Sequence, residues 1–137
     1  MEEKIKITEL DHLRLSKEVI IARNEKNIEL KNLEMLAHEI KRAEKVDSKA
    51  ITPEFITMNS VVKVENLETN KIMTVKIVYP KEANFKKGHL SVFSPMGSAL
   101  LGYKVGDTVQ FEAPKGIIEI KILSIDYQPE ANGDYLV

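Results

Sequence analysis

The chain has 137 residues, no Cys and no Trp, and a formal charge of −1 from 20 basic and 21 acidic side chains. The lack of Cys excludes a disulfide scaffold and a Cys-ligated zinc site. The balanced charge disfavours direct, sequence-specific nucleic-acid binding and fits a protein partner better.

The longest apolar run that we find, Val19–Ala22, is far shorter than the roughly 20 residues that span a bilayer. The N-terminal residues are charged throughout and lack the apolar core of a signal peptide. We therefore expect no membrane association and a cytoplasmic location.

Glycine and proline divide the chain into two parts. All 6 Gly and all 5 Pro lie beyond residue 52, whereas residues 1–50 carry 11 basic and 11 acidic side chains. This shift predicts an N-terminal helical unit over residues 1–50 and a turn-rich domain over residues 51–137.

The N-terminal unit begins with Ile5 and Ile7 alternating with lysines, which predicts a short extended segment. Thr8 follows as an N-cap, with Asp11 in the first helical turn. The first helix is predicted from about residue 9 to 22, with Leu10, Leu13 and Ile20 on one stripe and Lys17 in the remaining position of that stripe.

A second helix is predicted over about residues 28–45, because apolar residues recur there at spacings of 3, 4 and 3: Leu33, Leu36, Ile40 and Ala43. The short polar connection between the helices makes them antiparallel neighbours. Two arrangements are open: a free-standing helical hairpin with its tip at residues 23–28, or two helices packed on the C-terminal domain as an α+β layer.

Beyond residue 57 the pattern changes to β. Strands are predicted at 61–64, 73–79, 90–93, 105–111 and 117–127. Ser94 followed by Pro95 marks the start of a short helix, and Gly102 marks its end. We therefore expect an α+β domain of about five antiparallel strands and one short helix. Residues 126–137 are predicted to pack on the sheet as a tail anchored by Tyr127, Tyr135 and Leu136.

No catalytic motif is found. The three histidines, His12, His38 and His89, lie in three different predicted elements. The segment from Gly97 to Gly102 has the glycine spacing of a phosphate-binding loop but lacks the lysine that must follow it. Glu25 and Glu29 could share a helical face, yet neighbouring basic residues neutralise them. We expect no catalytic residue, no metal and no cofactor.

The segment FSPMGSALLGYKVGDTV, residues 93–109, resembles the C-terminal domain of the bacterial Gre transcript cleavage factor superfamily. Residues 56–66, 78–80, 90–102 and 126–136 look like segments of the Rnk group within it, in the same order. The resemblance implies an FKBP-like domain preceded by a short antiparallel coiled coil.

The resemblance also implies a partner, bacterial RNA polymerase, bound at the rim of its secondary channel. In this superfamily the C-terminal domain docks through the region where the short helix begins. Carried over to this chain, that region comprises Phe93, Ser94, Pro95, Met96 and Ser98.

Gre factors insert a long coiled coil whose acidic tip helps to hold a catalytic Mg²⁺. Here the predicted helices reach only about 24 Å, and the tip, represented by Arg23, Asn24, Glu25 and Glu29, is mixed in charge. Our hypothesis is a monomeric regulator that occupies the channel site, competes with Gre-type factors and does not stimulate RNA cleavage. The alternatives are a Gre-like cleavage cofactor, an FKBP-like peptidyl-prolyl isomerase and an unspecified protein-interaction module.

Overall fold

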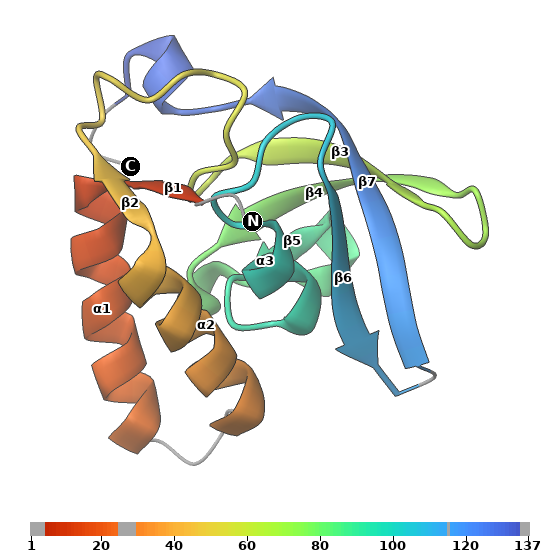
Figure 1. Cartoon of the computed structure of the whole chain (residues 1–137), viewed down its shortest axis with the longest axis horizontal. Helices are drawn as coiled ribbons and strands as arrows, with labels where there is room; N and C mark the ends of the chain where they lie inside the picture. Colours follow the sequence, from red (N-terminus) through yellow and green to blue (C-terminus); the bar gives the residue numbers. More distant parts are fainter. Residues whose placement is uncertain (1–4, 25–29, 115, 135–137) are drawn as a thin grey trace.

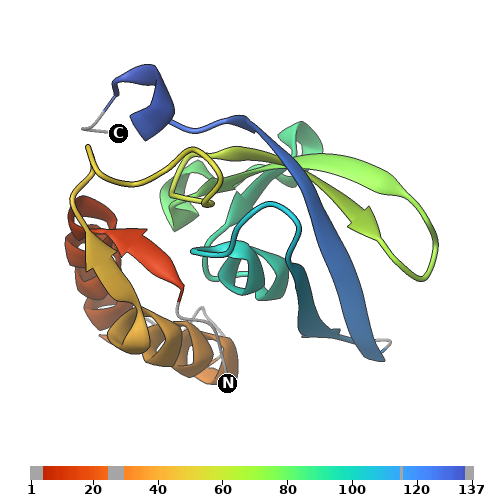
Figure 2. The ribbon, with the colours of Figure 1, turned by 45° about the horizontal axis from the view of Figure 1, so that its top comes forward.

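The computed structural model describes residues 5–24, 30–114 and 116–134. Its elements, in chain order, are β1 (Lys6–Thr8), α1 (Glu9–Asn24), α2 (Leu30–Arg42), β2 (Glu44–Val46), β3 (Val61–Asn66), β4 (Ile72–Val78), η1 (Pro80–Glu82), η2 (Phe85–Lys87), β5 (His89–Ser91), α3 (Pro95–Leu100), β6 (Thr108–Ala113), β7 (Gly116–Tyr127) and η3 (Glu130–Asn132). The α+β class predicted from the sequence is confirmed. Two helices lie to one side, and a curled sheet wraps around α3 on the other (Figure 1, Figure 2).

The large sheet has five strands in the order β5-β4-β3-β7-β6. Four of them pair antiparallel, but β5 runs parallel to β4, so the prediction of an all-antiparallel sheet was wrong at this edge. Pro80 ends β4, and the chain then passes through the two 3₁₀ turns η1 and η2 and returns, so that β5 starts at His89 opposite Lys76 and runs in the same direction as β4. The loop of charged residues thus contains the two turns that allow β5 to pair parallel with β4.

A second, two-stranded sheet pairs β1 with β2 in parallel, from Lys6 opposite Glu44 to Thr8 opposite Val46. The predicted extended lead-in is confirmed. The second helix ends at Arg42, earlier than residue 45, because the next residues form β2. The residues entering α1 and those leaving α2 are therefore held side by side.

The predicted apolar stripe of α1 was wrong. Leu13 and Ile20 are 54% and 60% exposed, whereas Leu15, Val19 and Ala22 are buried. Apolar residues occur all around this helix, so their spacing alone does not select the buried face. The stripe of α2 is clearer, and its Leu33, Leu36 and Ile40 are buried as predicted.

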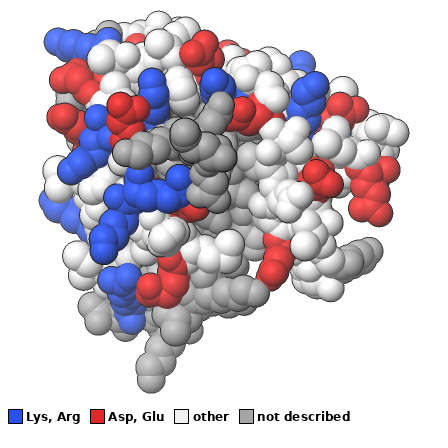
Figure 3. All heavy atoms as spheres, in the orientation of Figure 1, with Lys and Arg blue, Asp and Glu red and all other residues white. Residues whose placement is uncertain are grey.

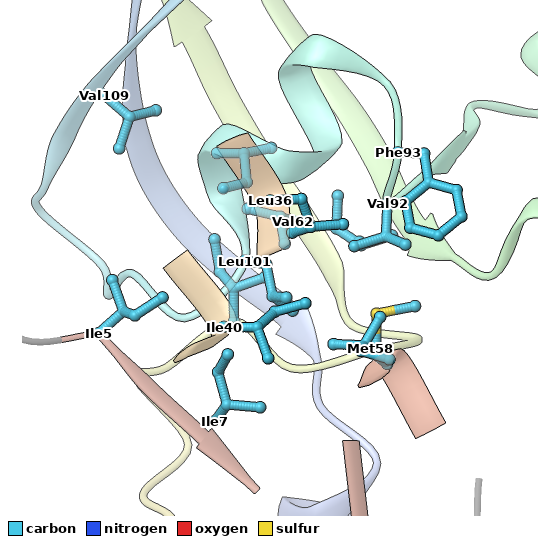
Figure 4. Packing of buried hydrophobic residues seen from close by; sticks show 14 of the residues in the cluster. Ile5, Ile7, Leu36, Ile40, Met58, Val62, Val92, Phe93, Leu101 and Val109 are labelled. Atoms are coloured by element: carbon cyan, nitrogen blue, oxygen red, sulfur yellow. The ribbon is translucent and has the colours of Figure 1, made fainter. Parts of the chain in front are cut away.

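The hydrophobic core is one continuous cluster that includes residues from both predicted units. Ile5, Ile7 and Ile40 from the N-terminal part lie near Leu101 and Val62 of the remainder (Figure 4). The helices thus pack as a layer on the rest of the chain, the second of the two arrangements that the sequence left open. No helix in the described ranges is long and apolar enough to cross a membrane.

The C-terminal segment is held by polar contacts. Gln128 Nε2 donates hydrogen bonds to the carbonyl oxygens of Thr52 and Phe55, at 2.9 and 2.7 Å. Glu130 Oε1 accepts one from the Thr57 hydroxyl at 2.7 Å. Tyr127, predicted as an anchor, is 37% exposed, and the other two predicted anchors, Tyr135 and Leu136, lie outside the described residues.

Candidate docking surface

The start of α3 is built by the hydroxyl group of Ser94. Its Oγ accepts a hydrogen bond from the Gly97 N–H at 3.1 Å and donates one to the Ser91 carbonyl oxygen at 2.6 Å. Pro95 occupies the first helical turn, where its missing N–H costs nothing. The predicted N-cap and helix start are confirmed, and this hydroxyl both donates and accepts a hydrogen bond within the chain.

The five residues predicted for docking lie around this helix start at different depths. Phe93 is buried, with its ring in the core beside Val92 (Figure 4). Ser94, Pro95, Met96 and Ser98 are half-buried. The Ser98 hydroxyl donates back to the carbonyl oxygens of Ser94 and Pro95, at 3.0 and 3.2 Å. Any contribution of Phe93 to docking would therefore come through its support of the helix start from below.

Pro95 and Ser98 line a groove of about 250 Å³, which we call the α2/β6 groove. Its walls come from α2, α3, the loop after α3 and β6: Met35, Leu36, Glu39, Pro95, Ser98, Ala99, Tyr103, Thr108, Val109, Gln110, Phe111 and Glu112. Met35 is 55% exposed at its mouth. The structure thus joins the predicted helix start to parts of α2 and β6 that the sequence did not connect with it.

Sequence reasoning missed Met35 and Phe111 as groove residues. Met35 is next to Leu36 in the sequence but lies outside the apolar stripe of α2. An apolar residue just outside a predicted buried stripe was the signal available from the sequence. Phe111 is a regular residue of a predicted strand. Their proximity depends on α2 packing beside α3, a contact between distant parts of the chain that no local pattern contains.

The free end of the helix pair carries an ion pair. Arg23 Nε and Nη2 contact the two carboxylate oxygens of Glu34 at 3.1 and 3.2 Å, linking α1 to α2. Asn24 ends α1, and Glu25 and Glu29 lie outside the described residues. The charge of Arg23 is thus balanced by a carboxylate on the neighbouring helix.

The charged surface is mixed rather than of one sign. On the face shown in Figure 3, Lys and Arg atoms are densest over α1, β2 and α2, with acidic side chains between them. In the part of the chain that the structure describes, no group of three His, Asp or Glu side chains is placed to hold a metal ion. His12 lies close enough to Lys45 that burial and this positive charge lower the pKa of its imidazole.

The sequence model of the family described as "Transcription elongation factor, GreA/GreB, C-term" matches residues 51–127, a range that includes all of α3 and the five-stranded sheet. The chain belongs to the GreA/GreB family. The resemblance to the Gre superfamily noted in the sequence is confirmed.

Two relatives illustrate the range of the GreA/GreB family. "Regulator of nucleoside diphosphate kinase" from Escherichia coli strain K12 is 39% identical over 100 residues, which cover 72% of this chain and 74% of the relative. This match confirms the resemblance to the Rnk group. "Transcription elongation factor GreA" from Thermosipho melanesiensis is 34% identical over 117 residues, covering 85% of this chain and 74% of that protein.

The fold is also that of a solved GreA/GreB structure. The "prokaryotic transcription elongation factor GreA/GreB from Nitrosomonas europaea" has a TM-score of 0.74 and 31% sequence identity, and the match covers 92% of this chain and 100% of that one. The similarity thus includes the helical layer as well as the sheet, and relates this chain to transcription elongation.

Proposed function

We propose that this protein binds bacterial RNA polymerase at the rim of its secondary channel, through the start of α3 and the α2/β6 groove. Membership of the GreA/GreB family supports the partner. The observation that carries the surface is the groove itself, because it is lined by Pro95 and Ser98, for which the resemblance to the Gre superfamily implies a role in docking.

The chemistry of the groove suits a protein partner. Its floor and walls include Leu36, Ala99, Val109 and Phe111, and it has the volume for one or two apolar side chains. Polar groups at its rim, Glu39 and Gln110 among them, can orient what enters. A small apolar pocket with a polar rim is typical of a site that receives an anchor residue from another protein.

We further propose that binding does not stimulate RNA cleavage. Helix α1 has 16 residues and is therefore about 24 Å long. The one described ion pair at the free end of the helices, Arg23 with Glu34, is neutral. A short pair of helices with a balanced end would occupy the channel entrance and exclude a Gre-type factor without delivering carboxylates to the catalytic metal.

A charge placed in the groove tests the docking surface. Met35→Glu puts a carboxylate at the mouth of the groove on a side chain that is already 55% exposed, so folding should be preserved. We expect polymerase affinity to fall by about tenfold or more, which corresponds to ~1.4 kcal/mol. Binding would be measured by fluorescence anisotropy of the labelled protein against purified polymerase.

Ile72→Glu is the matched control, because Ile72 is 59% exposed at the start of β4 and does not line the groove. Its affinity should stay within about twofold of the parent. Equal losses in both variants, or unchanged binding of Met35→Glu, would reject this docking surface. A GreA protein titrated into the parent complex should displace the label if both use one site.

A further inference from the structure

Asp11 has an unusual position for an acidic residue in the first turn of a helix. It is the third residue of α1, and its side chain is only 1% exposed. Its N–H donates to the Thr8 hydroxyl at 3.0 Å, the first half of a capping box. In a complete capping box the side chain at this position would accept the N–H of the cap residue. Here Asp11 Oδ2 instead accepts the N–H of Met58 at 3.0 Å.

This bond joins two distant parts of the chain. Met58 is fully buried in the segment that leads into β3, 47 residues away, and its side chain lies in the core near Val92 and Phe93 (Figure 4). Asp11 thus connects the N-terminal end of α1 to the backbone beside the five-stranded sheet. A change in the protonation of this carboxyl group therefore acts on the contact that holds the N-terminal end of a helix about 24 Å long.

The carboxyl group of Asp11 can accept more hydrogen bonds than its surroundings supply. Within the described part of the chain, Asp11 Oδ1 is buried without a hydrogen-bond partner. A buried carboxylate needs several donors to offset lost hydration. Here burial raises the pKa of Asp11 from 3.8 to about 7, although the Met58 N–H opposes the shift.

The charged groups around Asp11 come from three elements. Arg14 on α1 lowers the pKa of Asp11, and Glu130 in η3 raises it. Tyr79, after β4, has its own pKa raised by burial and by the charge of Asp11, with Glu18 of α1 adding to it. The pKa of Glu130 is itself raised by burial and, to a smaller extent, by the charge of Asp134.

We propose that Asp11 is a positioning residue, a proton-sensitive joint that holds α1 against the segment preceding β3. The protonated carboxyl group is neutral and still accepts the Met58 N–H. The carboxylate brings a charge into the same buried site and weakens the attachment of α1. The joint belongs to the chain alone and does not depend on polymerase binding.

The direction of the pH dependence follows from the two pKa values. Between 3.8 and about 7 the folded chain holds a proton that the opened chain releases. Opening is therefore favoured as pH rises through this range, and levels off above it. The protection factors of α1 amides against hydrogen exchange should fall by about tenfold per pH unit across the middle of the range.

The experiment is hydrogen exchange, corrected for intrinsic rates, on the full chain from pH 5 to pH 8. In the parent, protection of α1 amides should fall by about fiftyfold from pH 5 to pH 7, and the β3 and β7 amides should lose less. Asp11→Asn, which keeps the acceptor for Met58, should remove this slope for α1. Glu9→Gln, at an exposed acid of the same turn, should retain it.

A second measurement needs no variant. The ¹³C shift of the Asp11 carboxyl carbon, followed by NMR in the parent protein, should titrate with a midpoint near 7. A midpoint near 4 would overturn the proposal. A slope that persists in Asp11→Asn would also overturn it. So would sheet amides that lose protection in parallel with α1, since the charge on Asp11 would then lower the stability of the whole fold and not the attachment of α1 alone.

Discussion

At the scale of single residues, Ser94 shows how one side chain can shape a surface without being offered to a partner. Its hydroxyl is used twice inside the chain, by the Gly97 N–H and the Ser91 carbonyl oxygen. By fixing the start of α3, these two hydrogen bonds hold the ring of Pro95 in position beside the α2/β6 groove. The role of Ser94 is therefore to hold α3, and a partner would contact its neighbours.

Ser94→Ala tests this role through stability. Loss of an N-cap hydroxyl costs about 1 kcal/mol, and the second hydrogen bond should bring the loss toward about 2 kcal/mol. The measurement is urea unfolding followed by circular dichroism. Ser48→Ala, at a half-buried serine in the turn after β2, should change stability by less than about 0.5 kcal/mol, and a similar small effect of Ser94→Ala would contradict the assigned role.

The residue scale also shows where sequence reasoning ends. Thr8 and Ser94 were identified as caps because a cap depends on residues within one helical turn. Asp11 was correctly placed in a first turn, but its burial depends on Met58, 47 residues away. Phe93 stood beside a recognisable helix start, yet its ring turns into the core.

At the scale of elements, α3 lies unusually close to the strand before it. A Cβ added at Gly97 would collide with the Ser91 carbonyl oxygen and reach within 3.0 Å of Ser94 Oγ. Neither the backbone oxygen nor the capping hydroxyl can move freely, because each is bonded to the other. Gly97 is therefore required for the approach of α3 to the end of β5.

Gly97→Ala should force α3 away from β5 and so disturb both stability and the groove. We expect a loss of about 1–3 kcal/mol in unfolding free energy, as for other overpacked sites, together with weakened polymerase binding. Gly106→Ala is the comparison: its φ of +95° carries backbone strain, but a Cβ there meets nothing within 4 Å. It should cost about 1–2 kcal/mol and leave polymerase binding unchanged, and preserved binding in Gly97→Ala would contradict the argument.

The elements differed in how well the sequence predicted them. Helix α2 was placed well because its periodicity is strong. The ends of β4, β6 and β7 were placed well because Pro80, Pro114 and Gly116 mark them. The buried face of α1 was wrong, since apolar residues surround that helix. The direction of β5 was wrong too, because strand direction depends on the turns of a charged loop.

At the scale of the whole molecule, the helices are a short layer on the sheet domain. One continuous core includes residues of α1, α2 and the sheet, so the helices are held along their length by packing. Their reach beyond the docking surface is limited by the 16 residues of α1 and the 13 of α2. This geometry favours a protein that occupies a site over one that acts deep within it.

The cleavage assay tests this conclusion. Added to backtracked elongation complexes with Mg²⁺, the protein should leave RNA cleavage within about twofold of the uncatalysed level, and should reduce the cleavage stimulated by a GreA protein as its concentration rises. Robust cleavage that is lost in Glu25→Gln or Glu29→Gln would establish the cleavage-cofactor alternative instead. A GreA protein alone is the positive control.

The pairing of β1 with β2 separates the length of the helices from the construction of their base. Lys6–Thr8 and Glu44–Val46 lie side by side, and the Glu44 N–H is bonded to the Ile5 carbonyl oxygen at 2.9 Å. The chain therefore leaves and rejoins the domain at one fixed point. Seven residues added to each helix would extend the pair by about 10 Å without changing a contact at that point. Evolution or design can thus set the reach of such a protein by insertion alone, while the five-stranded sheet and α3 stay the same.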